Sequence, residues 1–421
     1  MGLVNKSATS TLDQQTEIDL LNALMALTEH SLFASLDEAP ADTILGLAIS
    51  YKADTCPDKV DLGVGAYRTD DGKPYVFQVV RRVEEQMTNE LLNLRINKEY
   101  LPIDGIPELK NLTQKLLFGD CELVKSGRIC SAQSISGTGA LRVLANFIAT
   151  HLVTPKLFQF NSNNLSKPTW AAHQKIFSAE GLDPTLHDWS AIIEVIKKKQ
   201  LIPLLDTAYQ GFASGDLEKD AAAVRLFSQT GMEMFVAQSF AKNFGLYGER
   251  VGMLHMVCSS SSSARVALSN LKVVIRSMYS NPPKHGGEIV WRILSDAQLM
   301  EEWQNELKSV AGRLVRMRQL LYEALLLRKT PGNWDHLQRQ QGMFSFTGLS
   351  HFIGWYNCHE CFLQMMFDTA DQCDRMTKHW HIYLLKNSRI SLSGINTKNI
   401  NYVANAIDEC VRTIPFEDSR I

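Results

Sequence analysis

A single lysine, Lys242, stands among small, aromatic and apolar residues in the stretch QSFAKNFGLYGERVG. The run that leads into it, EMFVAQSFAKN, is typical of a strand that is buried on both faces. An amine at the end of such a strand loses hydration, which lowers its pKa and frees its lone pair. Lys242 could therefore form a Schiff base with a carbonyl group. The ordinary alternative is a solvated loop lysine.

A second stretch, SISGTGALRVLANFIATHL, places Ser136, Gly137 and Thr138 at the start of a predicted helix. Glycine lets the backbone approach a ligand closely, the two hydroxyls can donate hydrogen bonds, and the amides of a helix N-terminus attract an anion. The pattern is compatible with a phosphate site. It is also compatible with an ordinary turn and helix cap.

A carboxylate, Asp206, ends the apolar run LIPLLD and is followed by Tyr209. A carboxylate at a sheet end needs a cationic partner, and a protonated pyridine nitrogen would be one. A helix N-cap is the alternative role. An amine that traps aldehydes, a phosphate cradle and a carboxylate for a ring nitrogen are together what pyridoxal phosphate requires.

The same motifs belong to a longer series, in order, that includes KVDLGVGAYRTDDGKP, EYLPIDGIPEL, SGTGALRV, KPTW, DTAYQGFASGD, QSFAKNFGLYGERVGM, IRSMYSNPPKHG and GMFSFTGL. In this series, from about Ser31 to Thr413, the chain resembles the aspartate aminotransferase family of class I pyridoxal phosphate-dependent enzymes. The resemblance implies the α/β type I fold, with a large domain built on a mostly parallel sheet and a smaller α/β domain. It also implies transfer of an amino group between L-aspartate and 2-oxoglutarate.

The resemblance assigns a cofactor role to several residues. It implies that Lys242 binds pyridoxal phosphate covalently and then shuttles the proton at the substrate Cα. Tyr100 matches a tyrosine that reaches the phosphate from the neighbouring subunit of a homodimer. The other matching positions are Ser136, Gly137, Thr138, Ser239 and Arg250 for the phosphate, Asp206 for the ring nitrogen with His173 behind it, Tyr209 for the ring hydroxyl and Trp170 for stacking on the ring.

Dicarboxylate substrates are best held by two guanidinium groups, each of which can donate two parallel hydrogen bonds. By resemblance, Arg389 in NSRISLSG binds the α-carboxylate, and Arg276 in IRSMYSNPP binds the distal carboxylate across the dimer interface. Gly65, Phe344 and Trp170 match residues that line the substrate pocket. The partners implied are dicarboxylic amino acids and 2-oxo acids.

The chain departs from the family pattern in two places. The segment between His173 and Asp206 is short by roughly 45 residues, judged from typical element lengths. This shortening predicts that part of the central sheet is missing. The second departure is the insertion SHFIGWYNCHECFLQMMFD at about 350–368, for which a surface helix is a more ordinary interpretation than a zinc site.

Alternating helical and strand-like patterns position these residues. They predict an N-terminal extension over residues 1–30, a small domain from 31–75 and 326–421, and a large cofactor-binding domain over 76–325. The serine run 259–263 is expected to be an exposed loop, and EEWQNELKSVAGRLVRMRQLLYEALLLRK a long helix.

Composition narrows the function classes. A net charge of −2 gives no basic field for nucleic acid, and no apolar run approaches the ~20 residues of a membrane span. Eight scattered cysteines favour reduced thiols, and the acidic N-terminal segment is unlike a mitochondrial presequence, so we expect a cytoplasmic protein.

Two alternative functions remain open at this point. The first is an aminotransferase-like pseudoenzyme that acts through a dimer scaffold or protein binding, which the shortened segment and the insertion favour. The second takes Ser239 and Lys242 as the S-x-x-K pair of an acyl-transfer enzyme, but the companion S-D-N and K-T-G motifs are missing.

Overall fold

The computed structural model describes residues 15–16, 18–19, 36–38, 42–63, 65–152, 186–349 and 372–414. The chain forms two compact units, Met1–Gly46 and Leu47–Ile421, and the strands of the described residues belong to the second unit. Trp170, His173 and the 350–368 insertion lie outside the described residues, as does nearly all of the N-terminal extension.

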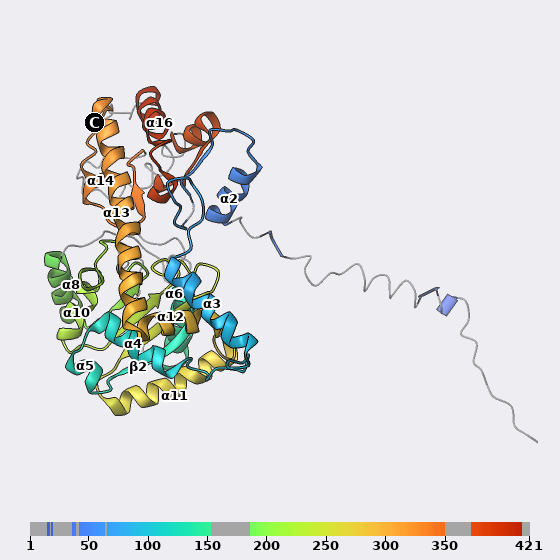
Figure 1. Cartoon of the computed structure of the whole chain (residues 1–421), viewed down its shortest axis with the longest axis vertical. Helices are drawn as coiled ribbons and strands as arrows, with labels where there is room; N and C mark the ends of the chain where they lie inside the picture. Colours follow the sequence, from blue (N-terminus) through green and yellow to red (C-terminus); the bar gives the residue numbers. More distant parts are fainter. Residues whose placement is uncertain are drawn as a thin grey trace, which may run out of the picture. The chain divides into compact units, whose positions relative to one another are not determined.

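The second unit is an α/β structure (Figure 1). Its strands are β1 (Val60–Asp61), β2 (Ile129–Ile135), β3 (Leu204–Thr207), β4 (Met234–Ser239), β5 (Val251–Val257), β6 (Phe344–Phe346), β7 (Ile382–Tyr383) and β8 (Arg389–Ser391). The helices are α2 (Thr43–Ala53), which crosses the unit boundary, α3 (Gln78–Leu92), α4 (Pro107–Phe118), α5 (Glu122–Lys125), α6 (Ser136–His151), α8 (Leu186–Lys199), α9 (Leu217–Asp220), α10 (Ala222–Gln229), α11 (Ser261–Met278), α12 (His285–Ser295), α13 (Ala297–Leu327), α14 (His336–Arg339), η1 (Leu392–Gly394) and α16 (Ile400–Thr413).

The main sheet has the strand order β2-β5-β4-β3 in the described part of the chain. β2, β4 and β3 run in one direction, but β5 is antiparallel to both of its neighbours. The prediction of a mostly parallel sheet therefore fits the direction of three strands and the parallel pairing of β3 with β4, but both pairings of β5 are antiparallel. Every residue of β4 and β5 is buried, as expected for strands covered on both faces.

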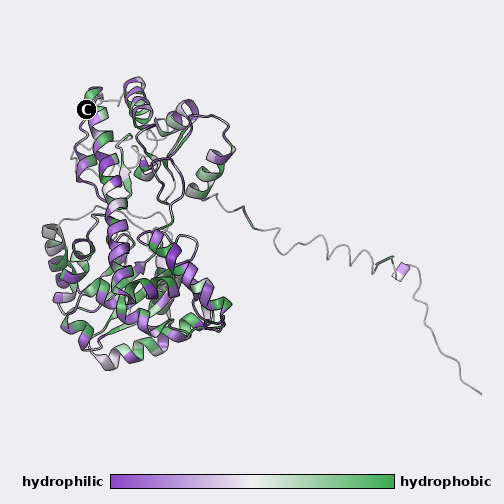
Figure 2. Cartoon of the chain, in the orientation of Figure 1, coloured by the Kyte–Doolittle hydropathy of each residue, from purple (hydrophilic) through white to green (hydrophobic). Residues whose placement is uncertain are grey.

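Two apolar clusters cover the faces of this sheet. On one face, α6 and α11 pack on alternate strand residues such as Ala237, Leu254 and Met256. On the other face, α4, α8 and α10 pack on Val236 and Val257. Because strand side chains alternate between faces, His255 and Gln238 point to this second face. Helices α11 and α13 alternate between hydrophilic and hydrophobic colour along their length, as helices with one buried side do (Figure 2).

The long helix α13 confirms the helix expected from the sequence near 301–329, and it contacts α3, α12 and α16. Its Glu306 caps α3 by accepting hydrogen bonds from the amides of Gln78 (2.7 Å) and Val79 (2.8 Å). A large apolar core around α13 contains residues of both predicted domains. Val403 comes from the predicted small domain and Trp303 from the predicted large domain. The division into these domains stays a prediction.

The serine run was expected to be a loop, and this prediction is wrong for most of it. Ser261–Ser263 form the first turn of α11, because the Ser260 side chain accepts a hydrogen bond from the Ser263 amide at 3.1 Å. Serine at an N-cap satisfies an amide that would otherwise have no helical partner. A cluster of serines therefore starts a helix here.

Candidate active site

Lys242 lies in the turn that follows β4, half-buried. Its Nζ is 5.2 Å from the centre of the Tyr209 ring. Burial is the main cause that lowers the pKa of Lys242; Arg250 and Arg389 add to the effect, and Asp206 opposes it. The amine thus lies within the electrostatic influence of Asp206, Arg250 and Arg389.

A compact cradle lies at the ends of β2 and β4. The hydroxyls of Ser136 and Ser239 are 2.8 Å apart, and both side chains are 3% exposed. The Ser136 amide donates to the Arg250 carbonyl at 3.1 Å, which ties the start of α6 to the start of β5. A Cβ on Gly137 would lie 3.2 Å from Ser239 Cβ, so glycine keeps this approach open.

Asp206 lies on β3, whose only partner in the described residues is β4. The Asp206 side chain is exposed. Its Oδ1 is 3.8 Å from the position that a Cβ on Gly137 would occupy, so the carboxylate reaches the start of α6. The sheet therefore brings Asp206 near the cradle, and its role there stays a prediction.

A cavity of about 350 Å³ adjoins the cradle and includes Thr138, Gly139 and Arg250 in its lining. It also includes Arg142, a second cation that the sequence analysis missed. Because residues four apart share a helix face, the position of Arg142 one turn after Thr138 could have indicated it.

The substrate side of the site comes from β6 and β8. Arg389 is 7% exposed, and its guanidinium carbon is 4.2 Å from the centre of the Phe344 ring. In the register of this antiparallel pair, Arg389 opposes Phe346, so Phe344 is its diagonal neighbour on the same face. Burial lowers the pKa of Arg389. Among the described residues, no carboxylate forms an ion pair with it.

Two further contacts close this side around Lys242. The Phe344 and Tyr209 ring centres are 6.5 Å apart, at an angle of 86°. A Cβ on Gly65 would lie 3.4 Å from the Phe344 ring, so a larger residue there would press on it. Burial raises the pKa of Tyr209 above its ordinary value, which keeps its hydroxyl protonated.

Arg318, which the sequence analysis also missed, holds β6 in place. It is 5% exposed and donates to the carbonyls of Gly342 (2.8 Å) and Phe344 (3.2 Å) and to Ser345 Oγ (2.9 Å). These bonds fix the backbone that carries the Phe344 ring. No local pattern in α13 distinguishes this arginine from its neighbours.

Two predicted residues lie apart from these groups. Tyr100 is 87% exposed, and Arg276 is exposed on α11, where it donates to Ser280. Both were expected to serve the site of a neighbouring subunit. Trp170 and His173, also predicted, cannot be placed because they lie outside the described residues.

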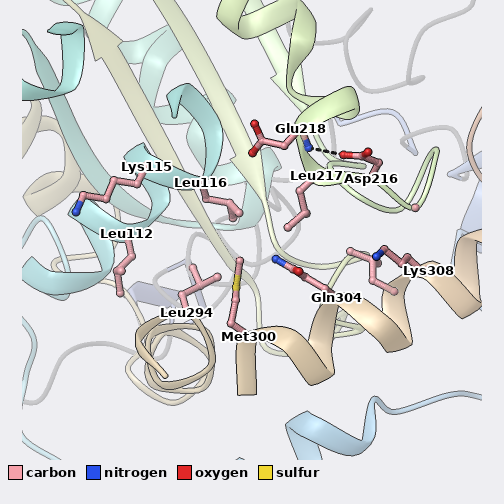
Figure 3. A pocket seen from close by; sticks show the side chains of 12 residues that line it. Leu112, Lys115, Leu116, Asp216, Leu217, Glu218, Leu294, Met300, Gln304 and Lys308 are labelled. Carbon is pink, nitrogen blue, oxygen red and sulfur yellow. Dashed lines mark hydrogen bonds between the residues drawn. The ribbon is translucent and has the colours of Figure 1, made fainter. Parts of the chain in front are cut away.

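A second cavity, of about 390 Å³, lies elsewhere, between α4, α9 and α13 (Figure 3). Leu116, Leu217 and Met300 form part of its apolar lining, and none of the predicted site residues lines it. Asp216 at its edge caps α9 by accepting from the Glu218 amide at 2.8 Å. This cavity takes no part in the candidate active site.

Metal chemistry and disulfides have no support in the described residues. No three potential metal-ligating side chains cluster there, and the described cysteines are all free thiols. The spacing that is loosely like a zinc site involves Cys358, Cys361, Cys373 and His379, of which Cys358 and Cys361 lie outside the described residues. None of the helices in the described ranges is long and apolar enough to cross a membrane.

With this geometry in place, comparison with known proteins defines the class. The family model for aminotransferases of class I and II matches in two segments, residues 57–179 and 156–407, so the chain belongs to the class I and II aminotransferase family. It is 41% identical over 433 residues to aspartate aminotransferase 1 of Medicago sativa, covering 92% of this chain and 97% of the relative.

Solved structures agree with this assignment. The cytoplasmic aspartate aminotransferase of Saccharomyces cerevisiae matches with a TM-score of 0.81 and 36% identity, over 91% of this chain and 99% of that one. An aromatic-amino-acid aminotransferase of Burkholderia pseudomallei, covalently bound to pyridoxal phosphate, matches with a TM-score of 0.78 and 34% identity, over 90% and 100%. The type I fold expected from the sequence is confirmed.

Proposed function

We propose that this protein is an aspartate aminotransferase that uses pyridoxal phosphate. It transfers the amino group between L-aspartate and 2-oxoglutarate and gives oxaloacetate and L-glutamate. The observation that carries the proposal is the convergence of the Lys242 amine, Asp206 and Arg389 beside the Ser136 and Ser239 cradle. The names of the relatives support the choice of aspartate as substrate.

The residues present fit pyridoxal phosphate. The paired hydroxyls of Ser136 and Ser239 and the side chain of Arg250 offer hydrogen-bond donors for a phosphate. Gly137 leaves space between these hydroxyls and Asp206 that a side chain would fill. Lys242, whose pKa is lowered by burial, offers the amine for the aldehyde. When bound, the cofactor supplies an electron sink for the bond that breaks at the substrate Cα.

The roles of the chain's own residues follow from their chemistry. The neutral Lys242 amine takes the proton from the substrate Cα and returns it. Asp206 would hold a proton on the ring nitrogen and Tyr209 would donate to the ring hydroxyl, while the family resemblance assigns the stacking role to Trp170. Arg389 binds the α-carboxylate as a fork of two hydrogen bonds, and the Phe344 ring below it fixes the plane of the fork.

The second substrate carboxylate requires a further cation, and we assign it to the partner subunit because Arg276 lies exposed on α11. We infer that the protein works as a homodimer in which Arg276 and Tyr100 of each subunit complete the site of the other. Both are exposed, and exposed apolar residues lie near them in sequence: Leu94 is 91% exposed and Val273 is 64% exposed. Burial of these side chains would favour such a dimer.

We further propose that 31–75 with 326–421 forms the small domain and 76–325 the large one. The proposed location is the cytoplasm. The names of the relatives give different compartments. The aspartate aminotransferase of Oryza sativa is named as cytoplasmic, and one from Dictyostelium discoideum is named as mitochondrial.

A reduction experiment tests the proposed function. The full-length protein is incubated with pyridoxal phosphate, reduced with borohydride, and digested for peptide mass mapping. We expect a pyridoxyl adduct on Lys242, and no adduct in Lys242→Ala. The exposed Lys219 serves as the internal control for non-specific modification. An adduct distribution that does not favour Lys242 would refute the proposal.

The pseudoenzyme remains the second candidate, because Asp206 is exposed on a strand with one described neighbour. Addition of aspartate to the loaded protein separates the two. An aminotransferase changes its visible absorption and releases oxaloacetate, whereas a pseudoenzyme keeps the absorption unchanged even if Lys242 carries the cofactor.

A further inference from the structure

A row of polar side chains crosses the apolar core on the α4 face of the sheet. We name it the polar row; all five members are at most 9% exposed, and His255 at its centre is 0% exposed. Its members are Gln114 of α4, Ser131 of β2, His255 of β5, Gln238 of β4 and Gln210 of the loop after β3. Buried polar groups cost free energy unless each is hydrogen-bonded, so such a row needs a reason.

One end of the polar row fixes the direction of its hydrogen bonds. The amide nitrogen of Gln210 donates to the carbonyls of Leu116 (2.7 Å) and Leu217 (3.3 Å), so its amide oxygen must face Gln238. That oxygen accepts from Gln238 Nε2 at 3.3 Å. Gln238 Oε1 therefore faces His255 Nε2, at 3.0 Å, and an amide oxygen can only accept. His255 must carry its proton on Nε2.

The other end leads to the same tautomer. Gln114 Nε2 donates to the Ile129 carbonyl (3.3 Å) and to Ser131 Oγ (2.8 Å). Ser131 Oγ is 2.7 Å from His255 Nδ1, and with its oxygen already accepting, its hydroxyl is free to donate to Nδ1. Every donor in the polar row then points the same way, from Gln114 to Gln210. Burial lowers the pKa of His255 to about 3, so the neutral form persists at physiological pH.

The polar row ends beside the catalytic amine. Gln210 directly follows Tyr209, whose ring lies 5.2 Å from Lys242 Nζ. The Gln210 carbonyl accepts from Asn243 Nδ2 at 3.2 Å, and Asn243 directly follows Lys242. Gln238 is in turn the residue before Ser239 of the cradle. Gln210 thus links the polar row, through its side-chain amide, to the Lys242 segment, through its backbone carbonyl.

We propose that His255 is a positioning residue: in its neutral Nε2–H tautomer it orients Gln238 and Gln210, and through them it holds the turns that carry Lys242 and Tyr209. An imidazole suits this task because it accepts a hydrogen bond on one nitrogen and donates one from the other. His255 on β5 therefore keeps the donor-to-acceptor direction of the hydrogen bonds the same from β2 to β4. An apolar side chain at this position would leave Gln238 free to turn its amide. The inference rests on the proposed role of Lys242, but its test does not depend on the cofactor.

The test measures the Lys242 amine in the full-length protein without cofactor. Lysines are labelled with trinitrobenzenesulfonate at a series of pH values, and the extent at Lys242 is read by peptide mass mapping against the exposed Lys219. The midpoint of the pH profile reports the basicity of the amine and does not depend on how easily the reagent enters. A turn that loosens rehydrates the amine and moves the midpoint up.

Three variants make the comparison. His255→Leu breaks the polar row and is expected to raise the midpoint by roughly half to one pH unit, which is about a threefold to tenfold change in the fraction of neutral amine. His255→Gln keeps a donor toward Gln238 and is expected to retain the wild-type midpoint. Met256→Ala removes a buried side chain from the same strand but on the opposite face, and it should leave the midpoint in place.

Equal midpoints for His255→Leu and Met256→Ala would overturn the proposal, and so would a shift in His255→Gln as large as that in His255→Leu. If His255→Leu fails to fold, Ser131→Ala replaces it and should shift the midpoint in the same direction by less. Nitrogen-15 NMR of the wild-type protein near pH 7 adds an independent check. A charged ring, or a proton on Nδ1, contradicts the assigned tautomer and the proposal with it.

A pyridoxyl adduct on Lys242 combined with an unmoved midpoint would reject the positioning role alone. The reverse result, a moved midpoint without an adduct, would reject the proposed function and keep the structural coupling.

Discussion

The two ends of the candidate cofactor site differ in how firmly the sheet holds them. At the cradle end, Ser136 and Ser239 are each 3% exposed and bonded to each other, and the strands that flank them are buried along their whole length. At the ring-nitrogen end, Asp206 is exposed on β3, whose residues are otherwise only partly buried. The same proposed ligand would thus meet a rigid end and a more open end.

The difference follows from the number of neighbours that each strand has. β4 and β5 are each paired on both sides, whereas β3 has β4 as its only partner in the described part of the sheet. A Cβ on Gly252 of β5 would lie 2.5 Å from the Gln238 carbonyl oxygen, so the backbones at the cradle are in direct contact. Placement of a functional group is as precise as the packing around it, and the cradle has more of that packing.

The largest effect is expected from Asp206→Asn. The substitution removes the charge opposite the ring nitrogen, so kcat should fall by about 10²-fold to 10³-fold, the range for loss of one electrostatic stabiliser in an active site. Because Asp206 is exposed, the free energy of unfolding should change by less than about 0.5 kcal/mol. Steady-state kinetics and urea unfolding of the same samples measure both quantities.

Asp120→Asn is the matched control, since Asp120 is also exposed and pairs with Lys125, at 3.3 Å, on the surface of the described chain. It should leave kcat unchanged. A wild-type kcat in Asp206→Asn would mean that Asp206 does not contact the ring nitrogen of the cofactor. The difference between the two ends of the site would then affect stability and not catalysis.

A smaller effect is expected at the cradle end from Gly137→Ala. Its Cβ would lie 3.2 Å from Ser239 Cβ, where the buried strands leave little room to move. Overpacking of this kind costs about 1 to 3 kcal/mol, so the Kd for pyridoxal phosphate should rise by about tenfold, with a smaller change in kcat. Fluorescence titration of the protein without cofactor measures the Kd.

Gly312→Ala is the control for this substitution. Gly312 is exposed on α13, and a Cβ there would meet nothing within 4 Å, so the Kd should not change while the helix gains up to about 1 kcal/mol. If Gly137→Ala binds the cofactor as tightly as Gly312→Ala does, the cradle is less rigid than its packing indicates, and the two ends are more alike than we infer.

The residues at strand ends could be proposed from the sequence because their signals are local. An apolar run that ends in Asp206 or Ser239, and glycines that open a helix after Ser136, can be read without knowing which strands pair. The family resemblance added Arg389 and Phe344, which lie far from Lys242 in sequence. The structure then places these two residues on diagonal positions of one β-pair.

What the sequence could not predict depends on contacts between distant segments. The pairing of β5 with β2 joins segments that are more than a hundred residues apart in the chain, and no local pattern encodes it. His255 therefore looked like an ordinary strand residue, although the pairing puts it between Ser131 and Gln238. The exposure of Asp206 likewise depends on which neighbours β3 has.

The last prediction concerns the free energy of unfolding at acidic pH and applies to the cradle end of the site. His255 lies in β5 behind the cradle, and burial lowers its pKa to about 3 from an ordinary value near 6.5. When the pKa of a group is lower in the folded state than in the unfolded state, the unfolded state binds the proton first as the pH falls. The free energy of unfolding is then constant above the unfolded pKa and decreases as the pH falls from the unfolded pKa to the folded pKa. The wild-type protein should therefore lose stability between pH 6.5 and 3.

His255→Gln does not titrate, so the difference between its unfolding curve and that of the wild type isolates this one proton. Above pH 7 the two curves should run parallel, and below about pH 6 the wild type should lose up to about 1.4 kcal/mol more for each pH unit. Carboxylates such as Asp54, whose pKa is lowered to about 2 by the Cys56 amide, Tyr383 and His381, contribute equally to both proteins. Urea unfolding at pH 7.5, 6 and 5 measures the difference. Curves that stay parallel to pH 5 would show that His255 is hydrated or charged in the folded protein. His255 would then not connect Ser131 to Gln238 in the polar row, and the packing at the cradle end would be less firm than we infer.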